Sequence, residues 1–137
     1  MSAGTYTHGF RQAYKCGADL TGKFGYAVKI SAANTVTIAT TGDDFIGTVF
    51  MEGQGGTPGD PPTVGLSATY RFCTVQHDGV VAAIAGGTIT AGQSVSVDTN
   101  GKFVAATTGK AIVGVAQEAA VSGTLFSMLI RPRGAAA

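Results

Sequence analysis

The sequence predicts an all-β protein, a small β-barrel or sandwich, and three observations support this prediction. Val and Ile together fill 20 of the 137 positions against four Leu, and β-branched side chains favour strands over helices. Several short segments alternate between apolar and polar residues, whereas no segment shows the 3.6-residue apolar period of an amphipathic helix. One stretch of the chain recurs 67 positions later. We therefore expect two duplicated three-stranded units with at most short helical turns, near residues 80–85 or 116–120.

The recurrence aligns residues 24–49 with residues 91–116 without a gap and with seven identities. Both copies contain the tetrad Ala-Thr-Thr-Gly. Both also carry a glycine inside a late strand, Gly47 in the first copy and Gly114 in the second. A glycine at that place indicates a close approach of neighbouring backbone or a β-bulge.

Each copy has the pattern of a hairpin followed by a third strand. The alternating segments 27–30 and 94–97 are the expected first strands, and the Asn-Gly pair at 100–101 favours a type I′ turn. Segments 68–75 and 125–130 are expected to be counterparts that complete the two units. Seven positions are expected to form the core: Phe72, Val95, Val97, Phe103, Val113, Val115 and Ile130.

The chain length is that of one domain, which we place at residues 15–131, with repeat units at about 16–75 and 83–131. Between the repeats, residues 52–62 are rich in Gly and Pro, which predicts a long exposed loop. Residues 132–137 are expected to form a flexible tail.

Residues 1–14 have no clear place in the repeat. They are expected to form either an extended arm that orders against a neighbouring molecule or the first strand of the domain. Aromatic and Arg side chains dominate the binding energy of many interfaces, and this segment contains several of them. The candidates for partner contact are Tyr6, His8, Phe10, Arg11 and Tyr14.

Two motifs that suggest catalysis or nucleotide binding are incomplete. Residues 17–23 resemble a phosphate-binding loop, but Phe24 stands where that motif needs a hydroxyl, and a strand follows where it needs a helix. Cys73 and His77 share one face of a strand, and no oxyanion-stabilising element accompanies them. We expect a turn at the first motif and a strand end at the second.

The acidic pair at residues 43–44 is a candidate cation site, but residues 110–111 of the second copy are Lys-Ala. The same backbone position therefore accepts unrelated side chains, as expected of a solvated turn. His8 has no neighbouring residues at zinc-ligand spacing. We therefore expect a protein that is not an enzyme, with no catalytic, cofactor-binding or metal-binding residues and no cofactor.

Charged residues make up 12% of the chain and the net charge is +1, which argues against direct binding of nucleic acid. Either the Thr, Ser and Gly side chains suffice to keep the chain soluble, or much of its surface is covered in an assembly. The charge is unevenly distributed, basic at both ends of the chain and acidic over residues 43–98. This pattern either steers subunits together or is the scatter expected of so few charges. Without a signal peptide or an apolar run of about 18 residues, we expect synthesis in a cytoplasm, no membrane contact, and reduced, buried Cys16 and Cys73.

Residues 79–98 and their continuation over 101–116 resemble the signature of small tailed-phage capsid decoration proteins, also called capsid cement proteins. The likeness covers roughly residues 15–50 and 79–131 and rests on a Gly/Ala/Val pattern. It implies a structural protein of the virion that binds the outer surface of an expanded head and stabilises contacts between major capsid proteins. It also implies self-association as a homodimer or homotrimer, and it offers no catalytic residues to carry over.

Two other classes of function stay open from the sequence alone. The first alternative is a carbohydrate-binding β-module of a phage tail or surface protein, which would usually present a platform of exposed aromatic rings; the chain contains no Trp. The second is a small β-barrel enzyme or substrate-binding domain, because the same duplication of a hairpin unit would build one.

Overall fold

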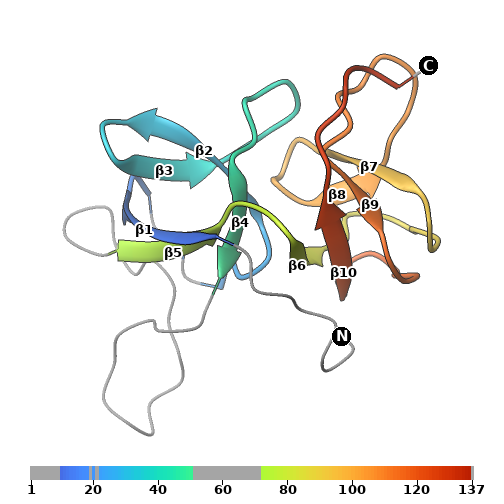
Figure 1. Cartoon of the computed structure of the whole chain (residues 1–137), viewed down its shortest axis with the longest axis horizontal. Coiled ribbons are helices and arrows are strands. Elements are labelled where there is room, and N and C mark those ends of the chain that lie inside the picture. Colours follow the sequence, from blue (N-terminus) through green and yellow to red (C-terminus); the bar gives the residue numbers. More distant parts are fainter. Residues whose placement is uncertain (1–9, 19, 21, 51–71, 137) are drawn as a thin grey trace, which may run out of the picture.

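The computed structural model describes residues 10–18, 20, 22–50 and 72–136, and in these residues all regular secondary structure is β-strand, arranged in two sheets (Figure 1). The all-β prediction is therefore confirmed. The strands of the first sheet are β1 (Arg11–Cys16), β2 (Ala27–Ala32), β3 (Thr35–Ile38), β4 (Gly47–Phe50) and β5 (Phe72–Gln76). The strands of the second sheet are β6 (Val80–Ile84), β7 (Ser94–Val97), β8 (Phe103–Ala105), β9 (Gly114–Ala116) and β10 (Leu125–Ile130).

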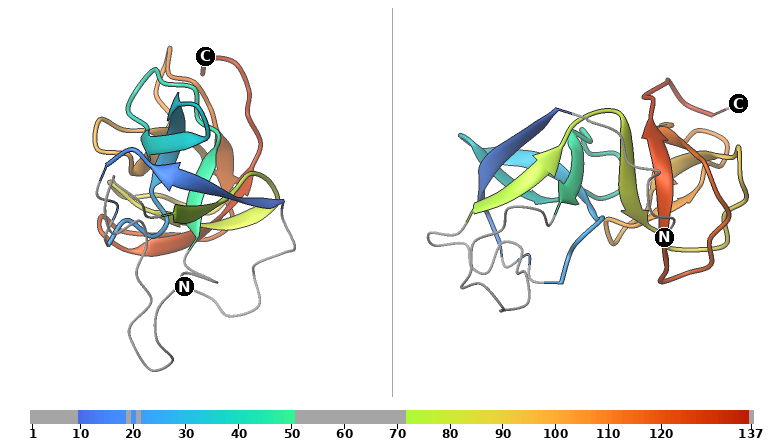
Figure 2. Two further views of the ribbon diagram at one scale, coloured as in Figure 1. Left: turned by 90° about the vertical axis from the view of Figure 1, so that its left-hand side faces the viewer. Right: turned by 60° about the horizontal axis from the view of Figure 1, so that its bottom comes forward.

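The first sheet is a closed barrel with the strand order β1-β3-β2-β4-β5, in which β5 pairs back to β1. The second sheet has the order β6-β10-β9-β7-β8. Its two outer strands meet at a single parallel bridge between Ala85 and Phe103. The two sheets lie side by side (Figures 1 and 2).

The two sheets use one pairing scheme. Val28 pairs with Gly47 between β2 and β4, and Val95 pairs with Gly114 between β7 and β9, so both partners are displaced by the 67 residues of the sequence recurrence. The antiparallel pairings of β1 with β5 and of β6 with β10 also correspond. Each unit therefore has five strands rather than the predicted three, and β5 and β10 are counterparts.

The glycines in the two late strands occupy equivalent close contacts. A Cβ on Gly47 would collide with the carbonyl oxygen of Gln76, and a Cβ on Gly114 would collide with the carbonyl oxygen of Leu129. Both carbonyls belong to the strand that pairs with the glycine's own strand. The close backbone approach indicated by the sequence is therefore present in both sheets.

Neither of the short helical turns that the sequence allows, near residues 80–85 or 116–120, is formed. Residues 80–84 instead form β6, in which four successive side chains from Val80 to Ala83 are buried. A strand buried on both faces shows no alternation, and a short apolar run of this kind cannot be distinguished from a buried helical segment by its pattern.

Four of the seven predicted core residues are at most 8% exposed: Val95, Val97, Phe103 and Val113. Ile130 is partly buried against the same cluster, and the side chain of Phe72 lies outside the described residues. The prediction for Val115 is wrong, because this side chain is only half-buried. Val115 pairs with Leu129, whereas its neighbour Ala116 pairs with the fully buried Met128, so the core lies on the other face of β9.

The end of the chain is bonded to the second sheet, whereas the sequence predicts a flexible tail over 132–137. The amides of Arg131 and Arg133 donate to the carbonyls of Val113 and Ile112, at 2.9 and 2.8 Å. Ala135 forms a bridge with Ala111. The pattern of small residues hides these bonds because they are made by the main chain. The Gly/Pro-rich loop at 52–62 lies outside the described residues.

Candidate interaction surface

Three of the five predicted contact residues, Phe10, Arg11 and Tyr14, lie at the start of β1, next to the end of β5. The amide of Phe10 donates to Asp78 Oδ1 at 2.6 Å, and its carbonyl accepts from the amide of His77 at 2.8 Å. Both the amide and the carbonyl of Phe10 are therefore hydrogen-bonded where β1 begins. Tyr6 and His8 lie outside the described residues.

His77 is the centre of this surface. Its ring stacks on Phe10, with centroids 5.4 Å apart and planes inclined by 26°. Its Nδ1 lies 2.9 Å from the carbonyl oxygen of Ile46, and its Nε2 lies 2.8 Å from the hydroxyl of Tyr14. Because a carbonyl only accepts, Nδ1 carries the hydrogen and donates it, and Nε2 accepts from Tyr14 in the neutral ring. These bonds fix the orientation of the imidazole beneath Phe10.

Arg11 is held by an aromatic ring and an amide side chain. Its guanidinium carbon lies 3.8 Å from the centroid of Phe50 at the end of β4, a cation–π contact. Its Nε donates to Gln76 Oε1 at 3.4 Å. Gln76 is itself fully buried and donates to the carbonyl of Asp78 at 3.1 Å. Arg11 is therefore positioned by side chains from two strands of the barrel, β4 and β5.

The three residues differ in what they offer a partner. Phe10 is 58% exposed, whereas Tyr14 is 8% exposed and belongs to the barrel core. Burial raises the pKa of Tyr14 above its ordinary value. The surface available to a partner is therefore the Phe10 ring and the outer part of Arg11, with Tyr14 and His77 as their support. Sequence reasoning missed this role of His77, because the residues it contacts are more than 30 positions away.

Cys73 does not form a catalytic dyad with His77. Cys16 and Cys73 are both buried and unbridged, as the sequence predicts. Burial, with the adjacent Cys16 thiol, raises the pKa of Cys73 to about 12, so its thiol is protonated and unreactive near neutral pH. Both nitrogens of the His77 imidazole already form hydrogen bonds, with the hydroxyl of Tyr14 and the carbonyl of Ile46.

The described part of the chain has neither a metal-binding cluster nor a membrane-spanning helix. It contains no cluster of three His, Cys, Asp or Glu side chains that could hold a metal ion. It also contains no helix long and apolar enough to cross a membrane. Asp43, of the acidic pair at 43–44, accepts from the amide of Thr40 at 2.8 Å and contacts Lys29 at 3.0 Å, so its carboxylate is satisfied within the turn.

Comparisons with known proteins identify related sequences and folds. A family model described as "Structural cement protein (E217 gp24/Pam3 gp6)" matches residues 7–131. No curated protein matches the sequence. A solved structure described as "The crystal structure of head fiber gp8.5 N base in bacteriophage phi29" matches with a TM-score of 0.61 and 15% identity, over 90% of this chain and 95% of that one. At this identity the likeness concerns the fold alone.

Proposed function

The chain belongs to the phage structural cement protein family, whose model matches residues 7–131, and from this premise we propose that it binds the outer surface of an expanded phage head and stabilises contacts between neighbouring major capsid proteins. Membership of that family makes it a structural component of the phage particle. We further propose that it acts without catalysis and self-associates as a homodimer or homotrimer.

The observation that carries the proposal, beside the family match, is the anchored start of β1. The main chain of Phe10 is bonded to Asp78 and His77, while the ring above it is mostly exposed. An exposed aromatic ring on a preordered backbone loses little conformational entropy when it is buried by a partner. This arrangement suits a contact with another protein made at the edge of the first barrel.

A cement protein also needs a body that transmits load between its contacts. The first barrel is closed, and the second sheet is joined to it by main-chain hydrogen bonds between Ala27 and Gly101 and between Ile84 and Gly25. Many weak contacts repeated over a shell add up to a large gain in stability. A stiff, weakly charged subunit is suited to that role.

The carbohydrate-binding alternative has less support. Among the described residues, Phe10 is the only exposed large aromatic side chain, and one ring beside a half-buried imidazole is not an extended sugar platform. The alternative stays an outcome of the experiment below.

Cosedimentation with purified heads tests the proposal. The protein is mixed with expanded and with unexpanded heads, and the bound amount is measured against the total concentration. We expect binding to expanded heads that saturates at a fixed ratio to the major capsid protein, and a rise in the temperature at which the heads release DNA. Absence of binding to expanded heads, together with affinity on a glycan array, would favour the carbohydrate-binding alternative.

A further inference from the structure

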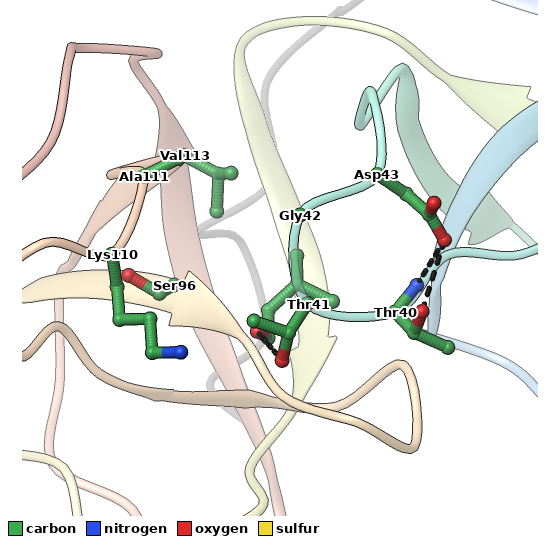
Figure 3. Close-up of a pocket in the computed structure, with 9 residues that line it drawn as sticks. Thr40, Thr41, Gly42, Asp43, Ser96, Lys110, Ala111 and Val113 are labelled. Atoms are coloured by element: carbon green, nitrogen blue, oxygen red, sulfur yellow. Dashed lines mark hydrogen bonds between the residues drawn. The ribbon is translucent and has the colours of Figure 1, made fainter.

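Two equivalent turns flank a recess between the two sheets. Residues 40–43 and residues 107–110 are related by the 67-residue offset and share the sequence Thr-Thr-Gly, but the fourth position is Asp43 in one and Lys110 in the other. The recess encloses about 260 Å³, part of it open solvent, and is lined by the first turn, by Ser96 of β7 and by Lys110 and its neighbours (Figure 3). It has room for the end of one side chain.

The acidic side of the recess is already neutralised. Asp43 accepts from the amide and the hydroxyl of Thr40, at 2.8 and 3.0 Å, and lies 3.0 Å from Lys29 Nζ. These contacts, first of all the bond from the Thr40 amide, hold the pKa of Asp43 below its usual value. In Figure 3 the carboxylate points toward Thr40 and away from Lys110.

The basic side carries charges that have no acidic partner. Lys110, Arg131 and Arg133 are exposed, and none of the three forms an ion pair with another described residue. Their main chains lie close together, because the amides of Arg131, Arg133 and Ala136 donate to the carbonyls of Val113, Ile112 and Lys110 at 2.9, 2.8 and 2.9 Å. We refer to these three side chains as the basic ledge.

Ser96 supplies a second, independent indication of a ligand. Its side chain is 3% exposed and lines the recess, and its Oγ has no hydrogen-bond partner. Buried hydroxyls are nearly always paired, so an unpaired one at the wall of an open recess indicates a partner that the isolated chain does not provide.

We infer that the recess and the basic ledge form a docking site for an acidic segment of a partner protein. One carboxylate of that segment lies between Lys110 and Ser96, accepting hydrogen bonds from the ammonium group and the hydroxyl, and further acidic side chains lie over Arg131 and Arg133. Charge-assisted bonds of this kind are stronger than neutral ones, and the ordered backbone beneath the ledge reduces the entropy lost on binding.

The observations favour a protein over a nucleic acid. The chain has a net charge of +1, and three cations release too few counterions for firm binding to a phosphate backbone at physiological salt. A single unpaired hydroxyl in the lining of the recess suits a single carboxylate. The inference rests on the proposed function only in taking the shell as the source of the acidic segment.

Titration with an eight-residue oligoglutamate peptide tests the site on the full chain, by heteronuclear NMR at low salt. We expect shifts at the amides of Ser96, Lys110 and Arg133. Lys110→Glu should weaken the affinity by about tenfold, because it removes an attraction and adds a repulsion. Lys15→Glu is the matched control, since it makes the same change of charge at an exposed lysine of β1; it should change the affinity by less than about twofold.

Ser96→Ala separates the recess from the ledge, because it leaves every charge in place. We expect it to weaken peptide binding severalfold without loss of the folded spectrum. Equal losses for Lys110→Glu and Lys15→Glu would overturn the inference in favour of unspecific charge. Tight binding of a double-stranded DNA oligonucleotide that Lys110→Glu abolishes would overturn it in favour of a nucleic acid.

Cosedimentation with expanded heads separates this inference from the proposed function. If the function holds and the inference fails, wild type and Lys110→Glu bind heads equally. If the inference holds and the function fails, the peptide binds but the heads do not. If both hold, Lys110→Glu lowers the affinity for heads, and added salt lowers the affinity of wild type more than that of the variant.

Discussion

The amide of Ala27, in the first barrel, donates a hydrogen bond of 2.8 Å to the carbonyl of Gly101, in the second sheet. Close by, the amide of Ile84 donates to the carbonyl of Gly25 at 3.1 Å. The segment leading into β2 therefore lies between β6 and the turn before β8. In the first barrel the corresponding segments are bonded to each other directly, because the amide of Lys15 in β1 donates to the carbonyl of Asn34, just before β3. The two sheets thus share main-chain hydrogen bonds.

The first prediction concerns the glycine at this junction. Gly25 has a φ of +82°, and a Cβ there would lie 3.2 Å from the amide nitrogen of Ile84 and 2.9 Å from the Leu125 side chain. Gly25→Ala should lower the free energy of unfolding by about 1–2 kcal/mol for the left-handed backbone, and by about 1–3 kcal/mol more for the crowded contact. Urea unfolding followed by circular dichroism measures the difference.

Gly92→Ala is the control for that prediction. Gly92 stands 67 residues after Gly25, has a φ of +84°, and has no atom within 4 Å of the position of a Cβ. It should therefore show the backbone penalty alone. Equal losses of stability for the two variants would contradict a tight junction between the sheets.

The second prediction compares two valines near β9. Val113 is 7% exposed and Val115 is half-buried on the opposite face of the sheet from the core. Val113→Asp should abolish soluble folding, because an unpaired buried carboxylate costs several kcal/mol or more against a total stability of about 5–15 kcal/mol. Val115→Asp should remain folded, with a lowered melting temperature. If Val113→Asp folds like wild type, the strand register of β9 is wrong.

The third prediction is a loss of stability at alkaline pH. Burial raises the pKa of Cys73 from 9.0 to about 12 and raises that of Tyr14 above 10.0. Above pH 9 the unfolded chain loses protons that the folded chain keeps, so the free energy of unfolding falls as the pH rises toward 12. Below pH 9 these two groups contribute no slope. Equilibrium unfolding in urea between pH 8 and pH 11 measures the effect.

Cys73→Ala is the control for the alkaline transition. It removes the titrating thiol, so the decline should begin nearer pH 10 and be shallower, with Tyr14 as the remaining buried group. An unchanged pH profile in this variant would show that the Cys73 thiol does not titrate as its burial requires.

The parts of the fold that local sequence pattern determines were predicted correctly. The hairpins of β2 with β3 and of β7 with β8 alternate in polarity, and the glycines at 47 and 114 mark close backbone contacts. The strand β6 was missed, because burial on both faces removes the alternation that identifies a strand. The bonded tail was missed as well, because its contacts are made by main-chain groups that any residue except proline can supply.

The candidate surface was only partly predictable for a related reason. The aromatic and basic residues at the start of β1 are visible in the sequence, but their support is not. Tyr14 contacts His77 across 63 positions, and Arg11 contacts Phe50 because β1 and β4 both pair with β5. Such contacts depend on the closure of the barrel, for which no local pattern exists.

The fourth prediction tests residues 1–9 as the part of the chain that engages the head. Because β1 begins at Arg11 and pairs with β5 from that residue onward, a deletion of residues 2–9 leaves every described strand intact. We expect the shortened chain to keep the melting temperature of wild type within about 2 °C, since a change of 1 kcal/mol would shift it by about 2–8 °C. It should bind expanded heads at least about tenfold more weakly, the loss expected when hot-spot side chains are removed.

Phe10→Ala complements the deletion, since it keeps the length of the chain and removes only the exposed ring. The bonds from the main chain of residue 10 to Asp78 and His77 do not involve that ring, so the start of β1 should stay in place. Weaker binding to heads in both variants, with unchanged stability, would locate the contact at the start of β1. If both variants bind as wild type does, the contact lies elsewhere, and the basic ledge becomes the principal candidate, because its three cations are exposed and form no ion pair with another described residue.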